Sequence, residues 1–391
     1  MGYFIRDRDD RFDKAKGGPR RILALDGGGT RGIVTLCYLK RIEDILRARH
    51  DNSPGFRLAH YFDLIAGTST GSIIAAGLAM EMQVDDLIKL YQDLANRVFR
   101  RNLSRWGFWR ARFDHKELAK ILQDILKEDN GAPMLLGSKK LKTGLLAVSK
   151  RMDTGSTWPL GNNPCGKYFT QREGSKYTAN KDYPLWKVIR ASTAAPYYFD
   201  PEEIVITEEE GKEPVIGRFV DGGVSPFNNP AFQAYMYATL DGYRVNWKPG
   251  RNQMLVVSVG TGRADAGAKA TGAAAGDAIG ALFGLMDDAV DLTETLMQWI
   301  GTGDTHRRID SELGDLSGDS MGAAKCTYLR YDLPLKRHEI NSEFPDMTYA
   351  DKAALVALDQ PGAMKTLRGM AERDAPGKVS ADHFPRVFDL R

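Results

Sequence analysis

The stretch "FDLIAGTSTGSIIAAGLA", residues 62–79, decides the fold. Its apolar start, residues 62–66, predicts a short buried strand, and the small and apolar residues 72–80 predict a helix. Between them, Gly67-Thr68-Ser69-Thr70-Gly71 fits the pattern G-x-S-x-G. In a strand–turn–helix context this pattern is typical of a nucleophile elbow, whose tight turn exposes the serine at the sheet edge. The helix that follows favours negative charge developing at its N-terminus.

The same strand–turn–helix pattern occurs earlier, in "RRILALDGGGTRGIV", residues 20–34. Residues 22–25 predict a strand, and 32–49 predict a helix with one apolar face. Gly27, Gly29 and Gly32 match the spacing of a dinucleotide fingerprint. The successive N–H groups of Gly27, Gly28 and Gly29 also suit an anion-binding nest. The loop therefore predicts a site for negative charge, either a phosphate or the oxyanion of an acyl transfer.

Further strands are predicted at 143–149, 215–220, 254–259 and 327–333, with a helix near 349–372. Continuous apolar strands separated by helices predict a three-layer α/β/α sandwich with a mainly parallel central sheet, followed by a mostly helical C-terminal portion. We expect four parts: a mobile charged arm (1–18), a catalytic domain (19–262), a mobile Ala/Gly-rich loop (263–281) and an extension packing on the catalytic domain (282–391).

Composition excludes several classes of protein. The chain has 391 residues and a formal net charge of +3, too small by itself to indicate nucleic-acid binding. Its three cysteines are widely spaced and predict neither a disulfide framework nor a zinc site. The longest apolar run, residues 73–80, is far below the ~20 residues of a spanning helix. The N-terminus lacks the apolar core of a signal peptide. We expect a soluble, cytoplasmic protein without metal or cofactor.

A nucleophilic serine needs a base. None of the six histidines lies in a glycine-rich turn after a buried strand. Asp221 does, in "RFVDGGVSPFNNP" (218–230), where Gly222 and Gly223 allow the backbone to turn closely around a reacting serine. A partly desolvated carboxylate is basic enough to take the proton directly. By itself, an ordinary Asp-Gly turn explains the same residues.

Taken in order, "DGGGTRG" (26–32), "GTSTG" (67–71) and "DGG" (221–223) resemble the patatin-like phospholipase family, of bacterial type, and so does "IRASTAAPYYFDP" (189–201). The resemblance spans roughly residues 20–262. It implies a serine acyl hydrolase that cleaves fatty-acyl esters of membrane glycerophospholipids, with Ser69 as nucleophile and Asp221 as base. It assigns the oxyanion hole to Gly27, Gly28 and Gly29. Supporting positions are Arg31, Gly32, Gly67, Gly71, Gly222 and Gly223. Arg31 either adds charge to the loop or braces it.

Three alternatives stay open. A nucleotide-binding oxidoreductase needs an acid at the end of a second strand, about 20 residues after the glycines. Asp51 has roughly that spacing, but no strand precedes it. If the chain is an actin-like sugar or acetate kinase, "SVGTG" (258–262) is its second glycine turn. This interpretation leaves the turns at Ser69 and Asp221 unexplained. The resemblance also permits a phospholipase effector of antiphage defence, activated by a cyclic nucleotide. A homodimer is compatible with each of these.

The segment 96–113, "NRVFRRNLSRWGFWRARF", carries six arginines and no acid among its aromatic residues. Such a mixture suits the interface of an anionic membrane, with Arg100, Arg101, Trp106 and Trp109 as contact candidates. An amphipathic cap that packs its aromatic residues on the core explains the same pattern. The Ala/Gly-rich stretch and the apolar helix after it predict either a lid over an acyl pocket or an oligomer contact.

Overall fold

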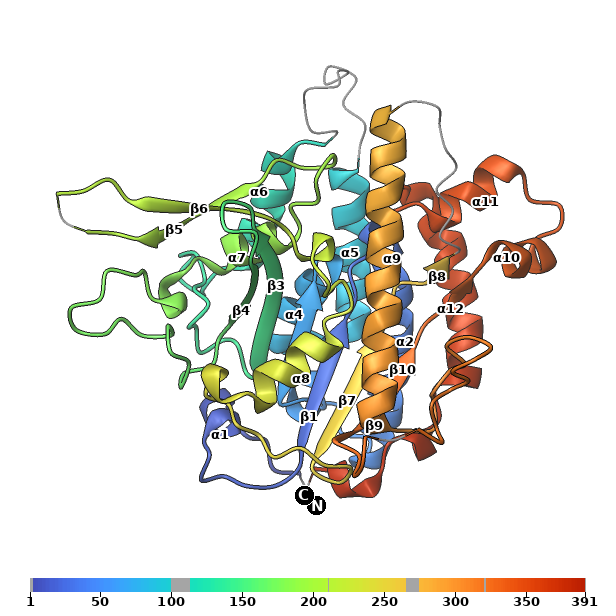
Figure 1. Cartoon of the computed structure of the whole chain (residues 1–391), viewed down its shortest axis with the longest axis horizontal. Coiled ribbons are helices and arrows are strands. Elements are labelled where there is room, and N and C mark those ends of the chain that lie inside the picture. Colours follow the sequence, from blue (N-terminus) through green and yellow to red (C-terminus); the bar gives the residue numbers. More distant parts are fainter. Residues whose placement is uncertain (1–2, 100–112, 210, 265–273, 320, 391) are drawn as a thin grey trace.

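In the computed structural model, which describes residues 3–99, 113–209, 211–264, 274–319 and 321–390, the central sheet has nine strands. Their order is β5-β6-β3-β2-β1-β7-β10-β9, with β4 paired to β3 (Figure 1). The strands are β1 (Arg20–Leu25), β2 (Leu64–Thr68), β3 (Gly144–Arg151), β4 (Thr157–Gly161), β5 (Glu202–Thr207), β6 (Val215–Asp221), β7 (Met254–Val259), β9 (Gly301–Thr302) and β10 (Cys326–Tyr331). A separate pair joins β8 (Arg263–Ala264) to β11 (Pro334–Leu335).

The sheet is mixed but mostly parallel, which confirms the predicted fold class. The strands β3, β2, β1, β7, β10 and β9 run parallel to one another. The antiparallel pairs, β3–β4, β3–β6 and β5–β6, gather at one edge. Side chains of β1 alternate between two separate apolar clusters, so both faces of the sheet are buried.

Helices cover both faces and complete the three layers. On one face, α8 (Ala231–Thr239) and α9 (Ala274–Ile300) pack over the smaller apolar cluster (Figure 1). The larger cluster lies on the other face, under α2 (Gly32–Arg49), α4 (Thr70–Ala79), α5 (Val84–Val98), α6 (His115–Ile125), α7 (Leu185–Ser192), α11 (Tyr349–Val356) and α12 (Met364–Lys378). The remaining helices are α1 (Arg8–Phe12), α3 (Leu58–Tyr61) and α10 (Arg337–Glu343). The helix predicted near 349–372 is thus divided into α11 and α12.

The prediction of a mobile N-terminal arm is wrong for Arg8–Phe12, which form the helix α1. Phe12 and Arg11 are each 1% exposed. The Arg11 guanidinium donates to the carbonyls of Phe62, at 2.6 Å, and Ala59, at 2.8 Å. Its charge also lies 3.5 Å from the Asp63 carboxylate. A buried guanidinium with several acceptors fixes the segment, because leaving those acceptors unpaired is costly.

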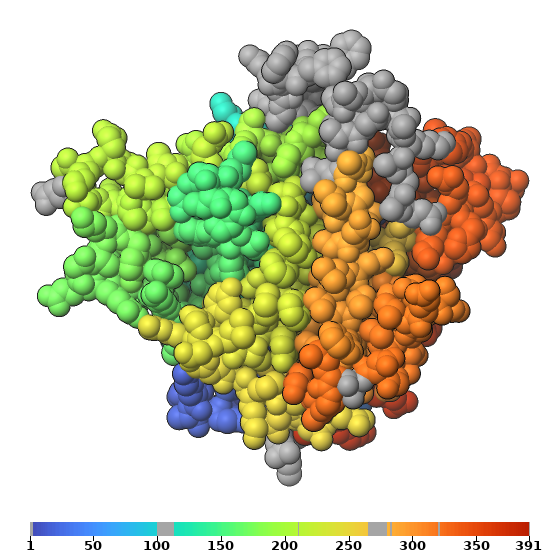
Figure 2. All heavy atoms as spheres, in the orientation of Figure 1, coloured from blue at the N-terminus to red at the C-terminus, as the bar shows by residue number. Residues whose placement is uncertain are grey.

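The expected Ala/Gly-rich loop is also wrong in its second half, because α9 begins at Ala274. Alanine is the best helix former, and the glycines among these residues are too few to prevent a helix that continues into an apolar stripe. The rest of that stretch, 265–273, lies outside the described residues. α9 stands on the surface beside α8 (Figures 1 and 2). Among the described helices, none has the length and apolar character needed to cross a membrane.

Candidate active site

Ser69 occupies the turn between β2 and α4, as the sequence predicts. Its backbone has φ +53° and ψ −126°, a conformation that L-residues rarely adopt. The Ser69 N–H donates to the Ser192 hydroxyl at 3.0 Å, and its carbonyl accepts from the Ser72 N–H at 2.8 Å. A Cβ atom on Gly67 would lie 2.2 Å from the Gly71 carbonyl oxygen, so the turn requires glycine there. The strained residue is held by its surroundings, a geometry that is typical of nucleophile elbows.

Asp221 ends β6 on the opposite side of β3 from Ser69. The register pairs Thr68 with Val148 and Asp221 with Ser149, so adjacent positions of β3 separate the two residues. β6 runs antiparallel to β3 and pairs only through its last three residues with the carboxyl end of β3, so Asp221 lies at the edge where Ser69 lies. The Ser69 hydroxyl lies close enough to the Asp221 carboxylate to lower the pKa of that carboxyl. Sheet topology thus joins two residues that are far apart in the sequence.

The environment of Asp221 makes it a stronger base than an exposed aspartate. Its side chain is buried, and desolvation raises its pKa to about 6, although the nearby Ser69 hydroxyl opposes that rise. The Gly223 N–H also donates to the Asp221 carboxylate, at 2.7 Å. A Cβ atom on Gly222 would lie 2.3 Å from the Val148 carbonyl oxygen, so glycine is needed for this turn. The carboxylate is oriented and partly desolvated.

The glycine loop lies beside Ser69, but its three N–H groups are not equivalent. The Gly27 N–H donates to the Asn228 carbonyl at 3.1 Å, which corrects the prediction that Gly27 supplies an oxyanion donor. Gly28 and Gly29 both line the pocket that contains Ser69. Within the described part of the chain, their N–H groups have no hydrogen-bond partner. The available donors are therefore those of Gly28 and Gly29.

Contacts on all sides fix the glycine loop. The Thr261 hydroxyl donates to the Gly27 carbonyl at 3.0 Å, so the "SVGTG" turn braces the loop. The Thr70 hydroxyl donates to the Gly29 carbonyl, also at 3.0 Å. Gly29 has φ +53°, and a Cβ atom there would lie 2.0 Å from the Leu358 carbonyl oxygen. At Gly32 a Cβ atom would lie 2.2 Å from the Thr70 side chain. This rigidity is what preorganised donors require.

Arg31 points away from Ser69. It lines a neighbouring polar pocket with Asp287 and Asp332, and it is not among the residues around Ser69. Burial lowers its pKa, and the two carboxylates oppose that shift. Of the two roles considered for Arg31, the geometry favours bracing the loop.

Asn228 is a site residue that the sequence reasoning missed. Its side chain is 8% exposed and lies against both Gly27 and Gly223, where added Cβ atoms would be 2.4 and 2.9 Å from its Oδ1. Oδ1 is buried without a hydrogen-bond partner. The residue lines the pocket of Ser69. The "FNNP" that follows the Asp-Gly-Gly turn was the available signal, because a buried asparagine in such a turn positions neighbouring groups.

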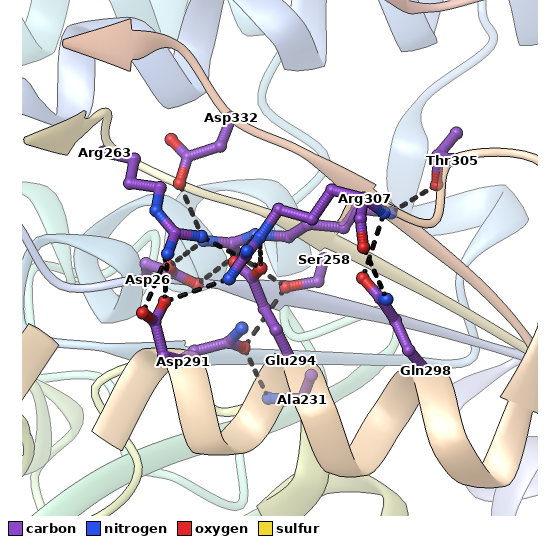
Figure 3. A network of polar contacts seen from close by, with 12 residues as sticks. Asp26, Ala231, Ser258, Arg263, Asp291, Glu294, Gln298, Thr305, Arg307 and Asp332 are labelled. Carbon is purple, nitrogen blue, oxygen red and sulfur yellow. Dashed lines mark hydrogen bonds and ion pairs between the residues drawn. The ribbon is translucent and has the colours of Figure 1, made fainter. Parts of the chain in front are cut away.

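A buried ion-pair network anchors the residue before the glycine loop (Figure 3). The Arg330 guanidinium donates to both carboxylate oxygens of Asp26, at 2.9 and 2.7 Å. It also pairs with Glu294 on α9 at 3.0 Å and with Asp332 at 2.8 Å. Both Asp26 and Arg330 are almost fully buried. Asp26 is thus a structural residue that ties the loop to β10 and α9.

The rest of the Ser69 pocket is mainly apolar. Met286 of α9 forms one wall, so this helix covers the site. Other apolar lining residues are Ile73, Leu94, Val98, Phe99, Leu118 and Phe199. None of the six histidines, all of which are described, lines the pocket. A search of the described residues finds no group of three or more His, Cys, Asp or Glu side chains placed to hold a metal ion. The apolar side chains around Ser69 and Asp221 are of the kind that contact an apolar chain.

Only the ends of the basic aromatic segment can be described. Phe99 lines the Ser69 pocket, and Phe113 is 1% exposed and stacks with Tyr198. These two aromatic residues pack on the protein, as the cap interpretation requires. The membrane-contact candidates Arg100, Arg101, Trp106 and Trp109 lie outside the described residues.

The model of the patatin-like phospholipase family matches residues 23–235. This chain belongs to the patatin-like phospholipase family. The matched region contains Ser69, Asp221 and the glycine loop. Asp51 lies in the turn after α2, so it is not placed to bind a ribose as the oxidoreductase alternative requires.

In sequence, the chain is similar to a mammalian phospholipase A2 and to patatin-like proteins of plants. The rat calcium-independent phospholipase A2-gamma is 32% identical over 267 residues, which are 64% of this chain and 29% of that protein. Patatin group J-1 of Solanum tuberosum is 27% identical over 62% of this chain and 60% of that protein. The probable inactive patatin-like protein 9 of Arabidopsis thaliana is also 27% identical, with the same coverage. The chain therefore spans less than two thirds of these relatives.

Solved structures give more distant similarities. Human GIVD cytosolic phospholipase A2 aligns with a TM-score of 0.42 at 10% identity, over 95% of this chain and 60% of that chain. VipD from Legionella pneumophila aligns with a TM-score of 0.35 at 14% identity, over 94% of this chain and 70% of that chain.

Proposed function

We propose that this protein is a serine lipid acyl hydrolase that cleaves fatty-acyl esters of membrane glycerophospholipids. The observation that carries the proposal is the placement of the Ser69 hydroxyl beside the Asp221 carboxylate in one mainly apolar pocket. The family membership and the phospholipase A2 name of the rat relative support the same chemistry.

The first half of the reaction forms an acyl-enzyme. The Ser69 oxygen attacks the ester carbonyl carbon while the Asp221 carboxylate takes the hydroxyl proton. The carbonyl oxygen becomes an oxyanion, and the N–H groups of Gly28 and Gly29 donate to it. When this intermediate collapses, the bond to the alcohol oxygen breaks. Asp221 returns its proton to that oxygen, so the lysolipid leaves as a neutral alcohol.

The second half releases the fatty acid. Asp221 takes a proton from a water molecule, which attacks the acyl carbon attached to Ser69. The same donors hold the new oxyanion. Collapse breaks the bond to the Ser69 oxygen, and Asp221 returns the proton to that oxygen. The substrate lies in a lipid surface, so we propose that the enzyme acts as a peripheral protein from the aqueous side.

The test compares the full chain with Ser69→Ala and Asp221→Asn on vesicles of phosphatidylcholine and phosphatidylglycerol, measuring released fatty acid. Both variants should lose at least about 10³-fold in rate. A fluorophosphonate probe should add covalently to Ser69 in the unaltered chain, as read by peptide mass. Ser317→Ala, which removes an exposed serine, is the matched control and should react normally. Fatty-acid release by Ser69→Ala at the normal rate would refute the proposal.

A further inference from the structure

A second cavity, of about 440 Å³, lies beside the carboxyl end of β10. Its walls come from residues 304–308 after β9, residues 330–334 at the end of β10, the start of α10, the end of α12 and His383. Neither Ser69 nor Asp221 lines it. The cavity is therefore distinct from the active-site pocket, and nothing in the proposed reaction uses it.

The inner wall of this cavity is a fixed ion-pair network (Figure 3). Arg307 pairs with Asp291 of α9 at 3.0 Å and also with Glu294. Arg330 holds Glu294 and Asp332, as described above. Arg263, Arg307 and Arg330 together offset much of the charge of Glu294 and Asp332, so these carboxylates repel a further anion less than unpaired ones would.

Other cationic residues around the cavity are not neutralised in this way. Within the described residues, Arg308, Lys336 and Lys378 form no ion pair. The only hydrogen bond of the Arg308 side chain in that part of the chain is to the Asp310 carbonyl, at 2.9 Å. Three cations that gather around one cavity without carboxylate partners favour an anionic ligand, because a concave site strengthens their common field.

Two histidines add donors to the same cavity. The Nε2 atom of His306 is buried and has no hydrogen-bond partner. The Nδ1 atom of His383 accepts from the Ser380 N–H at 3.4 Å and lies 3.0 Å from the Tyr331 hydroxyl. An accepting Nδ1 leaves the proton of neutral His383 on Nε2. A buried polar atom without a partner is costly unless a ligand satisfies it.

Two lining carboxylates oppose this charge. Glu339 accepts the N–H of Lys336 at 2.9 Å, so one of its oxygens serves the start of α10. Asp304 is exposed to water, which screens its charge. Arg308 and Lys378 are exposed as well, but six arginines and lysines line the cavity against four carboxylates, so its lining carries a net positive charge.

We propose that this cavity binds a small phosphate-bearing anion through Arg308, Lys336, Lys378 and His306. A phosphate group offers several acceptor oxygens in different directions, which matches donors that come from three separate segments of the chain. Lysine and arginine form their strongest hydrogen bonds with such groups. A volume of about 440 Å³ holds more than one phosphate group.

The cavity is connected to the active site by two shared residues. Arg330 lines the cavity and holds Asp26, which precedes the glycine loop. Arg307 lines the cavity and holds α9, whose Met286 lines the Ser69 pocket. An anion that draws these arginines toward the cavity weakens their pairing with α9. Binding should therefore change the rate of hydrolysis, a consequence that rests on the proposed function.

Isothermal calorimetry with inorganic pyrophosphate tests the site without reference to catalysis. The titration uses the full chain at constant ionic strength, with sodium chloride as the reference salt. The double variant Lys336→Gln/Lys378→Gln should bind pyrophosphate at least tenfold more weakly. The matched control, Lys352→Gln/Lys365→Gln, removes the same charge from α11 and α12 outside the cavity and should bind normally. Melting curves show whether each variant is folded.

A second arm distinguishes a soluble anion from a lipid headgroup. Sedimentation with phosphatidic acid vesicles, against phosphatidylcholine vesicles, is measured for the same variants. Binding of pyrophosphate that the cavity variant loses supports a soluble ligand. If the unaltered chain does not bind pyrophosphate but pellets with phosphatidic acid vesicles, and only the cavity variant loses this pelleting, the result supports a headgroup phosphate. Absence of both, or equal binding by the two double variants, overturns the proposal. Hydrolysis is assayed separately, so an inactive enzyme that binds pyrophosphate refutes only the proposed function.

Discussion

Ser69 and Asp221 face each other across the carboxyl end of β3, and the Ser69 hydroxyl acts on the pKa of the Asp221 carboxyl. The proposed reaction needs an ionised Asp221, and burial raises the pKa of this carboxyl to about 6. We therefore expect kcat/KM to fall about tenfold per pH unit below 6 and to be constant above about 7. The measurement is the pH profile of fatty-acid release under conditions where far-ultraviolet circular dichroism shows the chain folded. A flat profile between pH 5 and 8 would contradict the role of Asp221.

The same pKa predicts a change in stability. A carboxyl whose pKa is raised on folding binds its proton more tightly in the native state, so its contribution to stability falls as pH rises from about 4 to 6. Asp221→Asn replaces the ionisable carboxyl by a neutral amide, so the variant does not lose this stability as the pH rises. The variant should gain up to about 3 kcal/mol in unfolding free energy at pH 8, and much less at pH 4.5. Urea unfolding at the two pH values measures the difference. Equal gains at both would show that burial of the charge is not the cause.

Asn228 leads to a third prediction, about the oxyanion. Its backbone carbonyl holds the Gly27 N–H, and its side chain lies in the pocket beside Gly27 and Gly223. Asn228→Asp retains the shape but adds negative charge where an oxyanion forms. It should lower kcat by about 10²- to 10³-fold with little change in KM. Asn163→Asp, at another buried asparagine outside the pocket, is the control. An equal loss in both variants would indicate a general structural effect.

The sequence predicted those parts of the fold that depend on local pattern. The strand–turn–helix units around Gly27 and Ser69 have an apolar strand, glycines where the backbone turns and a periodic helix, and α2 begins and ends at the predicted residues. The site followed because Ser69 and Asp221 both lie in glycine-rich turns after strands. Arg11 was read as part of a mobile arm because its partners, the Phe62 carbonyl and Asp63, are contacts that no local pattern shows.

The role of each glycine was also beyond the sequence. The sequence "DGGG" does not distinguish its three consecutive glycine N–H groups, but in the structure the N–H of Gly27 donates to the Asn228 carbonyl. Arg31 is adjacent to the loop in the chain, yet its side chain lies in the next pocket with Asp287. Such assignments depend on side-chain direction and on segments about 200 residues away, which only the packed structure determines.

The Arg330 network makes a prediction about stability. Arg330→Met removes the charge that pairs with the buried carboxylates of Asp26 and Glu294 and with Asp332, which is 16% exposed. Breaking a buried pair in this way should cost about 3–5 kcal/mol. Urea unfolding at pH 7.5 measures the loss. The control, Arg308→Met, makes the same substitution at an exposed arginine and should change the free energy of unfolding by less than about 0.5 kcal/mol. If the two variants are equally stable, the network does not anchor the glycine loop.

The size of the Ser69 pocket makes the last prediction. Its free volume is about 70 Å³, far below the ~300–1,000 Å³ of typical ligand pockets, so long acyl chains need more room than this conformation offers. Met286 of α9 is one of the walls that restrict it. Met286→Ala should raise kcat/KM several-fold for long-chain p-nitrophenyl esters and leave the butyrate ester nearly unchanged. Met152→Ala, at an exposed methionine outside the pocket, is the control. An equal change for short and long chains would mean that α9 does not limit the acyl pocket.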